Sequence, residues 1–249
     1  MKGRPGRMPR LYVEAKLQQG AGLALPPEAA HHAARVLRLR EGDAVLLFDG
    51  RGGEYGARLR MPGRGQVIAE IDARRETERE SPLAVTLAQG VSSGEKMDFT
   101  IQKAVELGVA AVQPLLAEKS VVRLSGERAA KRLAHWRRVA IAACEQCGRN
   151  RLPEIREPKS PGVYCRTADA LSMRILLSPE GDRSLRDRMP GPGQKVILAV
   201  GPEAGFSSEE EALLVAAGFA KVRLGPRVLR TETAALAALA ALNALAGDF

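Results

Sequence analysis

From residue 83 onward, short apolar runs alternate with longer helical patterns, and this alternation constrains the fold more than any other feature of the sequence. The runs at 83–89, 109–116, 174–178, 195–200 and 220–224 are predicted strands. Helical patterns are predicted at 97–107, 126–147, 208–217 and 231–246, and the first three are each followed by a glycine. Parallel strands need a crossover between them, usually a helix. The sequence therefore predicts an α/β domain with a largely parallel sheet.

The chain before this domain has a different pattern. Short β patterns at 11–13, 44–48, 55–59 and 66–71 dominate, and a single helix is predicted at 27–37, with proline in its first turn. We predict a small barrel-like domain at 8–73. Residues 1–7 are rich in Gly, Pro and Arg and are expected to be a disordered or mis-started leader.

Residues 74–82 are charged and contain no apolar residue that a core could bury before the proline at their end. Such a stretch is typical of an interdomain linker. We therefore place the second domain at 83–249.

The chain is strongly basic, with 38 Lys and Arg against 29 Asp and Glu and a formal net charge of +9. The excess is concentrated between Lys119 and Arg151, where nine basic residues stand against two acidic ones. A polyanion such as RNA is an expected partner, and a merely solvated basic face is the alternative.

Other features limit the class of protein. No apolar run is long enough to span a membrane, so no membrane partner is expected. The three cysteines and the absence of a signal peptide favour reduced thiols in a cytoplasmic protein. Cys144 and Cys147 form a lone C-x-x-C without a second pair at zinc spacing, so no metal site is predicted.

Two segments of the second domain are candidates for chemistry. The predicted strand at 195–200 runs into Gly201-Pro-Glu-Ala-Gly205-Phe206 and then into a helix start marked by Ser208-x-x-Glu211, a capping-box pattern. Backbone N–H groups then lie at the carboxyl edge of a sheet, where α/β proteins bind ligands. The loop matches neither the Walker A motif nor G-x-G-x-x-G, and a turn that needs glycine only for its geometry is the alternative.

The second segment is Leu224-Gly-Pro-Arg-Val-Leu-Arg-Thr-Glu-Thr-Ala-Ala-Leu236, which joins a strand to the last helix. It gathers charged and hydroxyl residues in one turn, namely Arg227, Arg230, Thr231, Glu232 and Thr233.

On these two segments the chain resembles the SPOUT methyltransferases and, among them, the uracil-N3 methyltransferases of 16S ribosomal RNA. The same resemblance extends over Met8-Pro-Arg-Leu-Tyr-Val13, Lys96 with Ile101-Gln-Lys-Ala-Val-Glu-Leu-Gly108, Glu145-Gln-Cys-Gly-Arg149 and Leu177-Ser-Pro-Glu180. It implies an amino-terminal PUA-like RNA-binding barrel, a carboxyl-terminal α/β domain closed by a trefoil knot, and a homodimer that acts on 16S ribosomal RNA within the 30S subunit.

The resemblance also implies S-adenosylmethionine as the cofactor, bound among loops at 177–180, 201–205 and 224–233. The cofactor-binding residues expected from it are Leu177, Ser178, Gly201, Pro202, Glu203, Gly205, Leu224, Gly225, Leu229, Arg230, Thr231, Thr233 and Ala234. Where the family most often has glycine in the second loop, this chain has Ala204.

For catalysis, the resemblance and the chemistry of uracil together point to Arg230 first and to Arg10, from the partner subunit, second, because an arginine would stabilise negative charge on the ring oxygens. Either Glu203 or Glu232 would accept the proton of N3. A simple loop ion pair between Arg230 and Glu232 is the structural alternative. Expected RNA contacts are Arg10, Lys96, Arg123, Lys131, Arg138, Gln146 and Arg149.

Two other functions stay open at the level of sequence. One is methylation of a ribose 2'-hydroxyl of ribosomal or transfer RNA by the same class of enzyme. The other is a non-catalytic RNA-binding factor of ribosome assembly, suggested by the basic charge and by Ala204.

Overall fold

A computed structural model describes residues 8–63, 65–191 and 193–249, so the leader expected at 1–7 lies outside the described residues. The chain forms two compact units. The N-terminal unit comprises the chain up to Glu80 together with Cys144–Leu152, and the C-terminal unit comprises Ser81–Ala143 and Pro153–Phe249. Because these units are discontinuous in sequence, the linear boundaries at 73 and 83 stay a prediction.

The N-terminal unit is built on a five-stranded sheet in the order β1-β3-β4-β5-β2. Its strands are β1 (Arg10–Tyr12), β2 (Gly22–Ala24), β3 (Ala44–Phe48), β4 (Glu54–Gly63) and β5 (Gln66–Arg75). β1 lies parallel to β3, and the other pairs are antiparallel. Every second residue is buried from Tyr55 to Leu59 in β4 and from Val67 to Ile71 in β5, which is the period of a sheet with one face on a core.

The predicted helix at 27–37 is present, but it is made of two parts. α1 (Pro27–His31) continues as the π-helical turn η1 (His32–Val36). β2 was not predictable from its pattern, because two of its three residues, Gly22 and Ala24, are of types depleted in strands.

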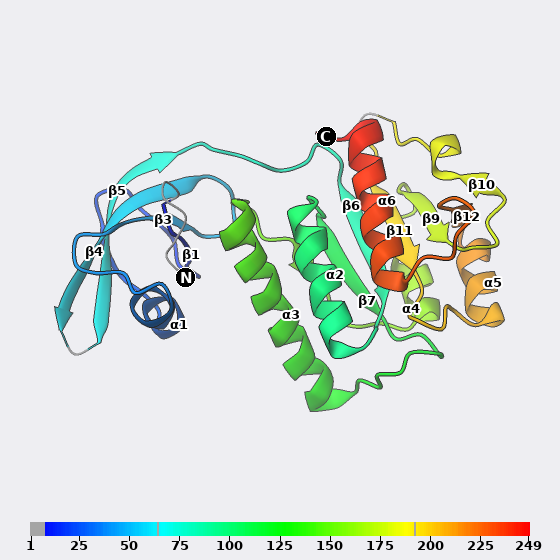
Figure 1. Ribbon diagram of the computed structural model, residues 1–249, viewed down its shortest axis with the longest axis horizontal. Coiled ribbons are helices and arrows are strands. Elements are labelled where there is room, and N and C mark those ends of the chain that lie inside the picture. The colour runs from blue at the N-terminus through cyan, green and yellow to red at the C-terminus, as the bar shows by residue number, and fades with distance from the viewer. Residues whose placement is uncertain (1–7, 64, 192) are drawn as a thin grey trace. The chain divides into compact units, whose positions relative to one another are not determined.

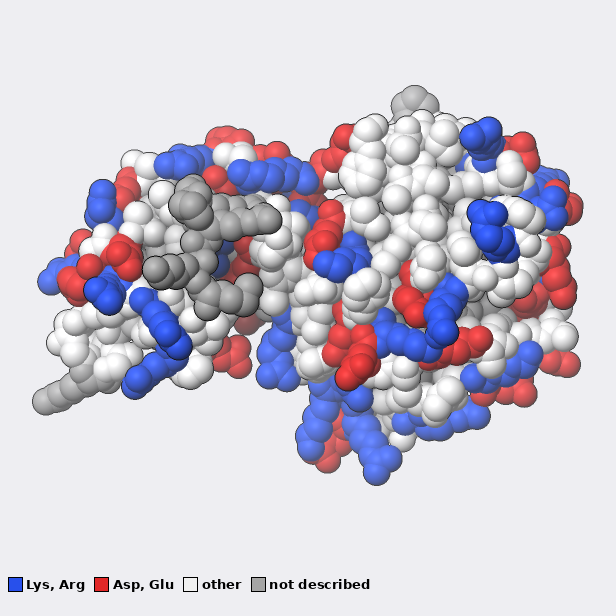
Figure 2. All heavy atoms as spheres, in the orientation of Figure 1, with Lys and Arg blue, Asp and Glu red and all other residues white. Residues whose placement is uncertain are grey.

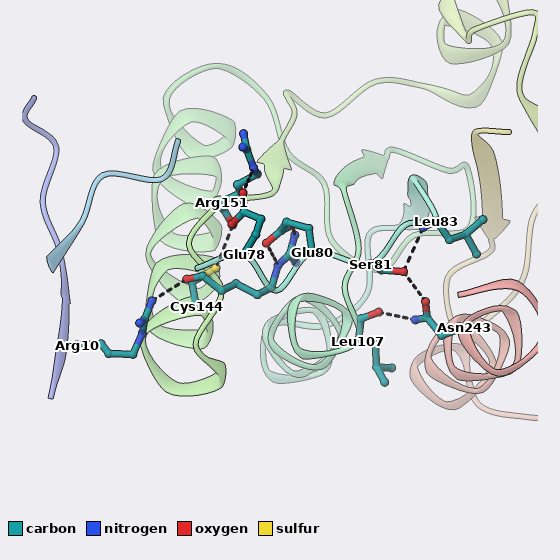
Figure 3. A network of polar contacts seen from close by, with 10 residues as sticks. Arg10, Glu78, Glu80, Ser81, Leu83, Leu107, Cys144, Arg151 and Asn243 are labelled. Carbon is teal, nitrogen blue, oxygen red and sulfur yellow. Dashed lines mark hydrogen bonds and ion pairs between the residues drawn. The ribbon is translucent and has the colours of Figure 1, made fainter. Parts of the chain in front are cut away.

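Ion pairs hold the charged segment that follows β5. β5 itself reaches Arg75, inside the predicted linker. Beyond it, Glu78 pairs with Arg151 and Glu80 with Arg149, both in the loop after α3 (Figure 3). The carboxylates of this stretch therefore hold it against the N-terminal unit through ion pairs.

A buried ion pair joins β1 to β4 in the same unit. Arg10 is 6% exposed, and its Nη1 donates to Glu54 Oε2 at 2.6 Å. Arg79 donates to the same oxygen at 3.2 Å. Burial raises the pKa of Glu54, but the hydrogen bonds from Arg10 and Arg79 outweigh it and leave the pKa below its ordinary value.

The C-terminal unit contains a seven-stranded sheet in the order β10-β12-β9-β11-β6-β7-β8, and all its neighbouring strands are parallel, as predicted (Figure 1). The strands are β6 (Val85–Gly90), β7 (Ala111–Leu115), β8 (Glu154–Ile155), β9 (Met173–Leu177), β10 (Arg183–Ser184), β11 (Val196–Val200) and β12 (Ala220–Arg223). All five residues of β11 are buried, as expected of a central strand covered on both faces.

Five α-helices and a short 3₁₀ turn are found among the described residues from 81 onward. They are α2 (Gly94–Glu106), α3 (Gly126–Cys147), α4 (Pro161–Thr167), η2 (Leu185–Asp187), α5 (Ser208–Ala216) and α6 (Thr231–Ala246). α2 and α6 contact each other and run side by side across one face of the sheet, whereas α4 packs on α5 (Figure 1). Among the described residues, no helix has the length and apolar character needed to cross a membrane.

The start of α5 differs by one residue from the prediction. Ser207, not Ser208, is the N-cap, and it forms the capping box with Glu210. Both serines have a glutamate three residues later, so the spacing alone could not choose between them. Glu211, the other candidate, pairs instead with Lys221 at 2.6 Å.

The last helix is held at its far end by a buried amide. Asn243 Nδ2 donates to Leu107 O, at the end of α2, at 2.7 Å, and its Oδ1 accepts from Ser81 Oγ at 2.8 Å (Figure 3). The Leu107 carbonyl is one of the groups that a helix end leaves without an intrahelical partner. α6 is thereby fixed along its length against α2.

We predict that Glu54→Gln lowers the free energy of unfolding by about 3–5 kcal/mol at pH 7, because Arg10 would stay buried without its counter-charge. The native pKa of Glu54 is depressed, so its stabilisation is complete above the unfolded-state pKa of about 4.3 and is lost as the pH falls through the native value. Urea unfolding across this pH range should show the gap between wild type and variant closing in acid.

Glu70→Gln is the matched control, since Glu70 pairs with Arg60 at 3.0 Å where both side chains are at least half exposed. It should cost less than about 1 kcal/mol. Equal losses in the two variants would contradict a special role for the buried pair.

Candidate functional site

A cavity of about 280 Å³ opens at the carboxyl ends of three neighbouring strands of the C-terminal unit. Its walls come from the loops after β9, β11 and β12, at 177–179, 200–205 and 222–234. The carboxyl edge of a parallel sheet is where α/β proteins bind ligands. The two segments singled out in the sequence, which are far apart along the chain, therefore meet around one cavity.

The loop after β11 crosses closely over the end of β6. A Cβ atom added at Gly90 would clash with the backbone nitrogen of Pro202. At the other end of the loop, Gly205 has φ +72°, which turns the chain toward the capped start of α5. These two glycines are needed for geometry: one for close approach and one for a left-handed conformation.

Hydrogen bonds from Thr231 and Gln89 lock the loops together. Thr231, the first residue of α6, donates through Oγ1 to the carbonyl of Gly201 at 2.5 Å. Gln89, near the end of β6, donates through Nε2 to Thr231 Oγ1 at 2.9 Å. Gln89 is fully buried and Thr231 is 7% exposed, so water cannot replace either bond. The loop before α6 is thus tied to the glycine loop.

Glu203, on the cavity wall, is engaged by donors from α2. Its Oε1 accepts from the backbone N–H of Ser93 at 3.1 Å and from Lys96 Nζ at 3.3 Å. Burial raises the pKa of Glu203, but the hydrogen bonds from its own backbone N–H, from Ser93 and from Lys96 outweigh it and lower the pKa. Glu203 is therefore an ionised, paired carboxylate and a weak proton acceptor.

Glu232 differs from Glu203 in its partners. It lies in the first turn of α6 and lines the cavity. Its Oε2 is buried, and no hydrogen-bond partner for this oxygen is found within the described part of the chain. The ion pair with Arg230 that the sequence left open is therefore not formed through this atom. A buried carboxylate oxygen without a partner is costly unless a ligand supplies a donor or a positive charge.

Arg230 is the N-cap residue of α6 and has an extended backbone conformation. Its side chain is exposed beside the cavity. The rest of the wall combines apolar side chains, such as Leu177 and Leu229, with the backbone of the glycine loop. A site of this kind can hold a ligand that has both an apolar ring and a charged group.

The structure brings nearly all the predicted cofactor-binding residues to the cavity wall; Thr233, which is exposed, is the exception. Ala204 is exposed and does not line the cavity, so its methyl group does not narrow the space. Sequence reasoning missed the end of β6, Gln89 and Gly90. A polar residue followed by glycine at the end of an apolar strand was the available signal.

The fold buries two of the expected RNA contacts. The sequence predicts Arg10 and Arg149 as RNA-binding, and Arg10 also as catalytic, but they are only 6% and 4% exposed. Their guanidinium groups are held by Glu54 and Glu80 in the N-terminal unit. Charge counted along the chain could not show that these arginines already have partners.

The other expected RNA contacts are differently placed. Lys96 lines the cavity and pairs with Glu203. Gln146 is exposed near the end of α3, and the remaining three are exposed in the loop before α3 or on α3 itself: Arg123, Lys131 and Arg138. Their role in RNA binding stays a prediction.

Comparison with known protein families gives two matches. Residues 79–243 match the RNA methyltransferase domain, and residues 25–72 match the RNA methyltransferase PUA domain. A protein of Buchnera aphidicola subsp. Schizaphis graminum named ribosomal RNA small subunit methyltransferase E is 34% identical over 97% of this chain and 98% of its own length. A protein of the same name from Synechocystis is 34% identical over 95% of this chain and 77% of its own.

Two solved structures are similar over nearly the whole chain. A methyltransferase of Legionella pneumophila, in complex with SAM, has a TM-score of 0.93 at 41% identity and covers 98% of this chain and 100% of its own. The ribosomal RNA small subunit methyltransferase E of Neisseria gonorrhoeae, bound to S-adenosyl methionine, has a TM-score of 0.90 at 41% identity with the same coverage.

We predict that Thr231→Val loosens both loops, because the isosteric side chain cannot bond to Gly201 O or accept from Gln89. Leaving these buried groups unsatisfied should cost about 1–3 kcal/mol of stability. Hydrogen–deuterium exchange should rise in 200–206 and 224–231. Thr233→Val, at an exposed position outside the cavity, is the control, and equal exchange in the two variants would count against the lock.

Proposed function

This chain belongs to the RNA methyltransferase family that includes ribosomal RNA small subunit methyltransferase E, and on that premise we propose that it transfers a methyl group from S-adenosylmethionine to N3 of a uridine in 16S ribosomal RNA. The observation that carries the proposal is the single cavity formed by three loops at the carboxyl edge of the sheet. Both segments on which the resemblance rests line this cavity.

The residues present fit the cofactor. The cavity volume lies near the lower end of the range of ligand pockets, about 300–1,000 Å³. Apolar residues such as Leu177, Leu224 and Leu229 would cover a purine ring, and the backbone of Gly201 and Gly225 allows close approach. The unpartnered oxygen of Glu232 leaves one free acceptor on the cavity wall, among the described residues, for a polar group of the bound molecules. When bound, S-adenosylmethionine supplies a methyl group activated by a sulfonium.

We assign charge stabilisation to Arg230. N3 of uracil bears a proton and becomes nucleophilic only as negative charge spreads to the ring oxygens. The Arg230 guanidinium, exposed beside the cavity, presents donors that would stabilise this charge as it develops. Arg10 has no part in the proposal, because its side chain is buried in an ion pair.

We assign proton removal to Glu232 rather than to Glu203. Glu203 has a lowered pKa and accepts from Ser93 and Lys96, so taking a proton would break bonds that it already makes. Glu232 Oε2 has no competing donor among the described residues. It can accept the N3 proton directly or through one water.

The wider setting is also part of the proposal. Val228, in the loop before α6, is 79% exposed beside the cavity, and a second copy of the chain would cover it and complete the site. We also propose that the C-terminal domain forms a trefoil knot, that the enzyme acts on the assembled 30S subunit, and that it is cytoplasmic. Light scattering tests the dimer, and methyl transfer to 30S particles compared with naked 16S RNA tests the substrate.

The function itself is tested by mapping methylation in 16S RNA from a strain that lacks the gene. Mass spectrometry should find one lost methyl group on a uracil base. A lost methyl group that had made its linkage resistant to alkali would show ribose methylation instead. An unchanged map, together with no calorimetric heat from S-adenosylmethionine, would favour a non-catalytic RNA-binding factor.

We predict that Arg230→Ala lowers kcat at least a hundredfold while the Kd for S-adenosylmethionine stays within a few fold, because one preorganised donor to a developing anion contributes about 10²–10³ to the rate. Single-turnover transfer of a labelled methyl group and calorimetry measure the two effects. Arg186→Ala, exposed in η2 and outside the cavity, controls for the loss of charge. An active Arg230→Ala enzyme would remove the residue from the mechanism.

We expect Glu232→Gln, which keeps the shape and loses the charge, to slow the chemical step by about 10²–10⁴, the usual contribution of a general base. Glu203→Gln should weaken the contact with Lys96 and change the rate much less. A reversed order of the two variants would transfer the assignment to Glu203.

A further inference from the structure

A second hollow, of about 440 Å³, lies over the amino-terminal half of α3 in the C-terminal unit. Four permanent cations and a histidine dominate its walls, and no carboxylate residue lines it. Its lining residues are Val122, Arg123, Leu124, Arg128, Lys131, Arg132 and His135. Figure 2 shows Lys and Arg side chains gathered over this end of α3, in the lower middle of the view.

The positive charge of this basic hollow is poorly compensated by the protein. Lys131 pairs with Glu127 at 2.7 Å, but their side chains are 75% and 81% exposed, so the pair is weak. Arg123 donates to a backbone carbonyl, that of Glu118, at 3.0 Å. In the part of the chain that the structure describes, Arg128 and Arg132 form no ion pair.

Another hollow in the same unit serves for comparison, because carboxylates on its walls pair with some of its cations. Of the four cations on its walls, Arg156 and Lys195 each have a carboxylate partner there, Glu154 at 2.8 Å and Asp169 at 3.5 Å, and Glu157 adds a third carboxylate. The basic hollow lacks such partners. A concave surface with uncompensated cations attracts and concentrates anions.

The basic hollow lies next to the candidate active site through the first turn of α2. The Arg132 guanidinium reaches Gly94 so closely that a Cβ atom there would lie 3.4 Å from Nη2. The residue before it, Ser93, donates its backbone N–H to Glu203 of the cavity wall. The residue two positions after it, Lys96, lines the cavity. One helical turn therefore separates the two hollows.

We propose that the basic hollow binds backbone phosphates of the RNA strand adjacent to the nucleotide that enters the cavity. The proposal rests on the proposed function for its choice of RNA as the polyanion. Arginine forks match phosphate oxygens in geometry and charge, and two of them, Arg128 and Arg132, have no competing carboxylate. Val122 and Leu124 offer apolar contact to the sugars between phosphates.

His135 is held in place for this role. Its Nε2 lies 2.6 Å from Asp98 Oδ2, so α2 fixes the ring at the edge of the hollow. Asp98 lies on α2 and His135 on α3, so this contact ties the ring to the neighbouring helix. The imidazole on the wall of the hollow is therefore held in place before a ligand binds, which lowers the entropy cost of ordering this one side chain.

The test is equilibrium binding of 16S RNA without cofactor, measured at several salt concentrations between 50 and 200 mM. Each phosphate contact contributes about 0.7–0.9 to the slope of log K against log salt. We expect Arg128→Ala/Arg132→Ala to reduce the slope by about 1.4–1.8. Arg128→Lys/Arg132→Lys keeps the charge and should retain most of the slope while weakening affinity, because it loses the forks.

Arg183→Ala/Arg186→Ala is the matched control, since both residues are exposed in the same unit and lie outside both hollows. Circular dichroism and calorimetry with S-adenosylmethionine establish that each variant is folded with an intact cavity. Equal slopes for the two alanine pairs would overturn the proposal.

The readouts separate this proposal from the proposed function. A reduced slope in a protein that transfers no methyl group would support the basic hollow and refute the chemistry. Normal methyl transfer with an unchanged KM for RNA in Arg128→Ala/Arg132→Ala would refute the basic hollow and leave the chemistry intact.

Discussion

The hydroxyl of Thr231 determines how the site is assembled. It donates to the glycine loop and accepts from the end of β6, so one buried atom joins three parts of the chain that are widely separated in sequence. Because Gly90 has no side chain, the glycine loop can pass over β6 close enough for this bond to form. These contacts hold the loop before α6 at a set distance from the glycine loop. They thereby fix the position of Glu232, the next residue of α6, on the cavity wall.

The basic residues fall into two groups, those paired with carboxylates inside the protein and those on the surface without such partners. In the N-terminal unit, Arg10 and Arg149 are buried against glutamates, and their charge serves the fold. In the C-terminal unit, Arg128 and Arg132 border a hollow without carboxylates, and their charge remains available to a partner. A net charge of +9 is therefore a poor guide to the RNA surface unless each cation is considered with its partners.

Much of the fold could be predicted because its long elements carry strong periodic patterns. α3 and α6 begin and end where the sequence predicts, and the strands of the parallel sheet are displaced by at most two residues. β8 and β10 were missed because two residues cannot show an alternation, and α4 was missed because its first residues, Pro161 and Gly162, are typical of a loop. Two loops of the site, at 201–205 and 224–233, were found through their unusual composition, and the loop at 177–180 only through the family resemblance. The partners of Glu203 and Arg10 were not, since they come from distant segments and leave no local mark in the sequence.

The anchoring of Asn243 has a consequence for the site at the other end of its helix. α6 supplies Thr231 and Glu232 at its first turn and is fastened through Asn243 about 18 Å away, at 1.5 Å per residue. Because a straight helix moves as a rigid body along its axis, a contact that fixes one end also limits the position of the other. Asn243 therefore helps to fix where Thr231 and Glu232 lie along the helix axis.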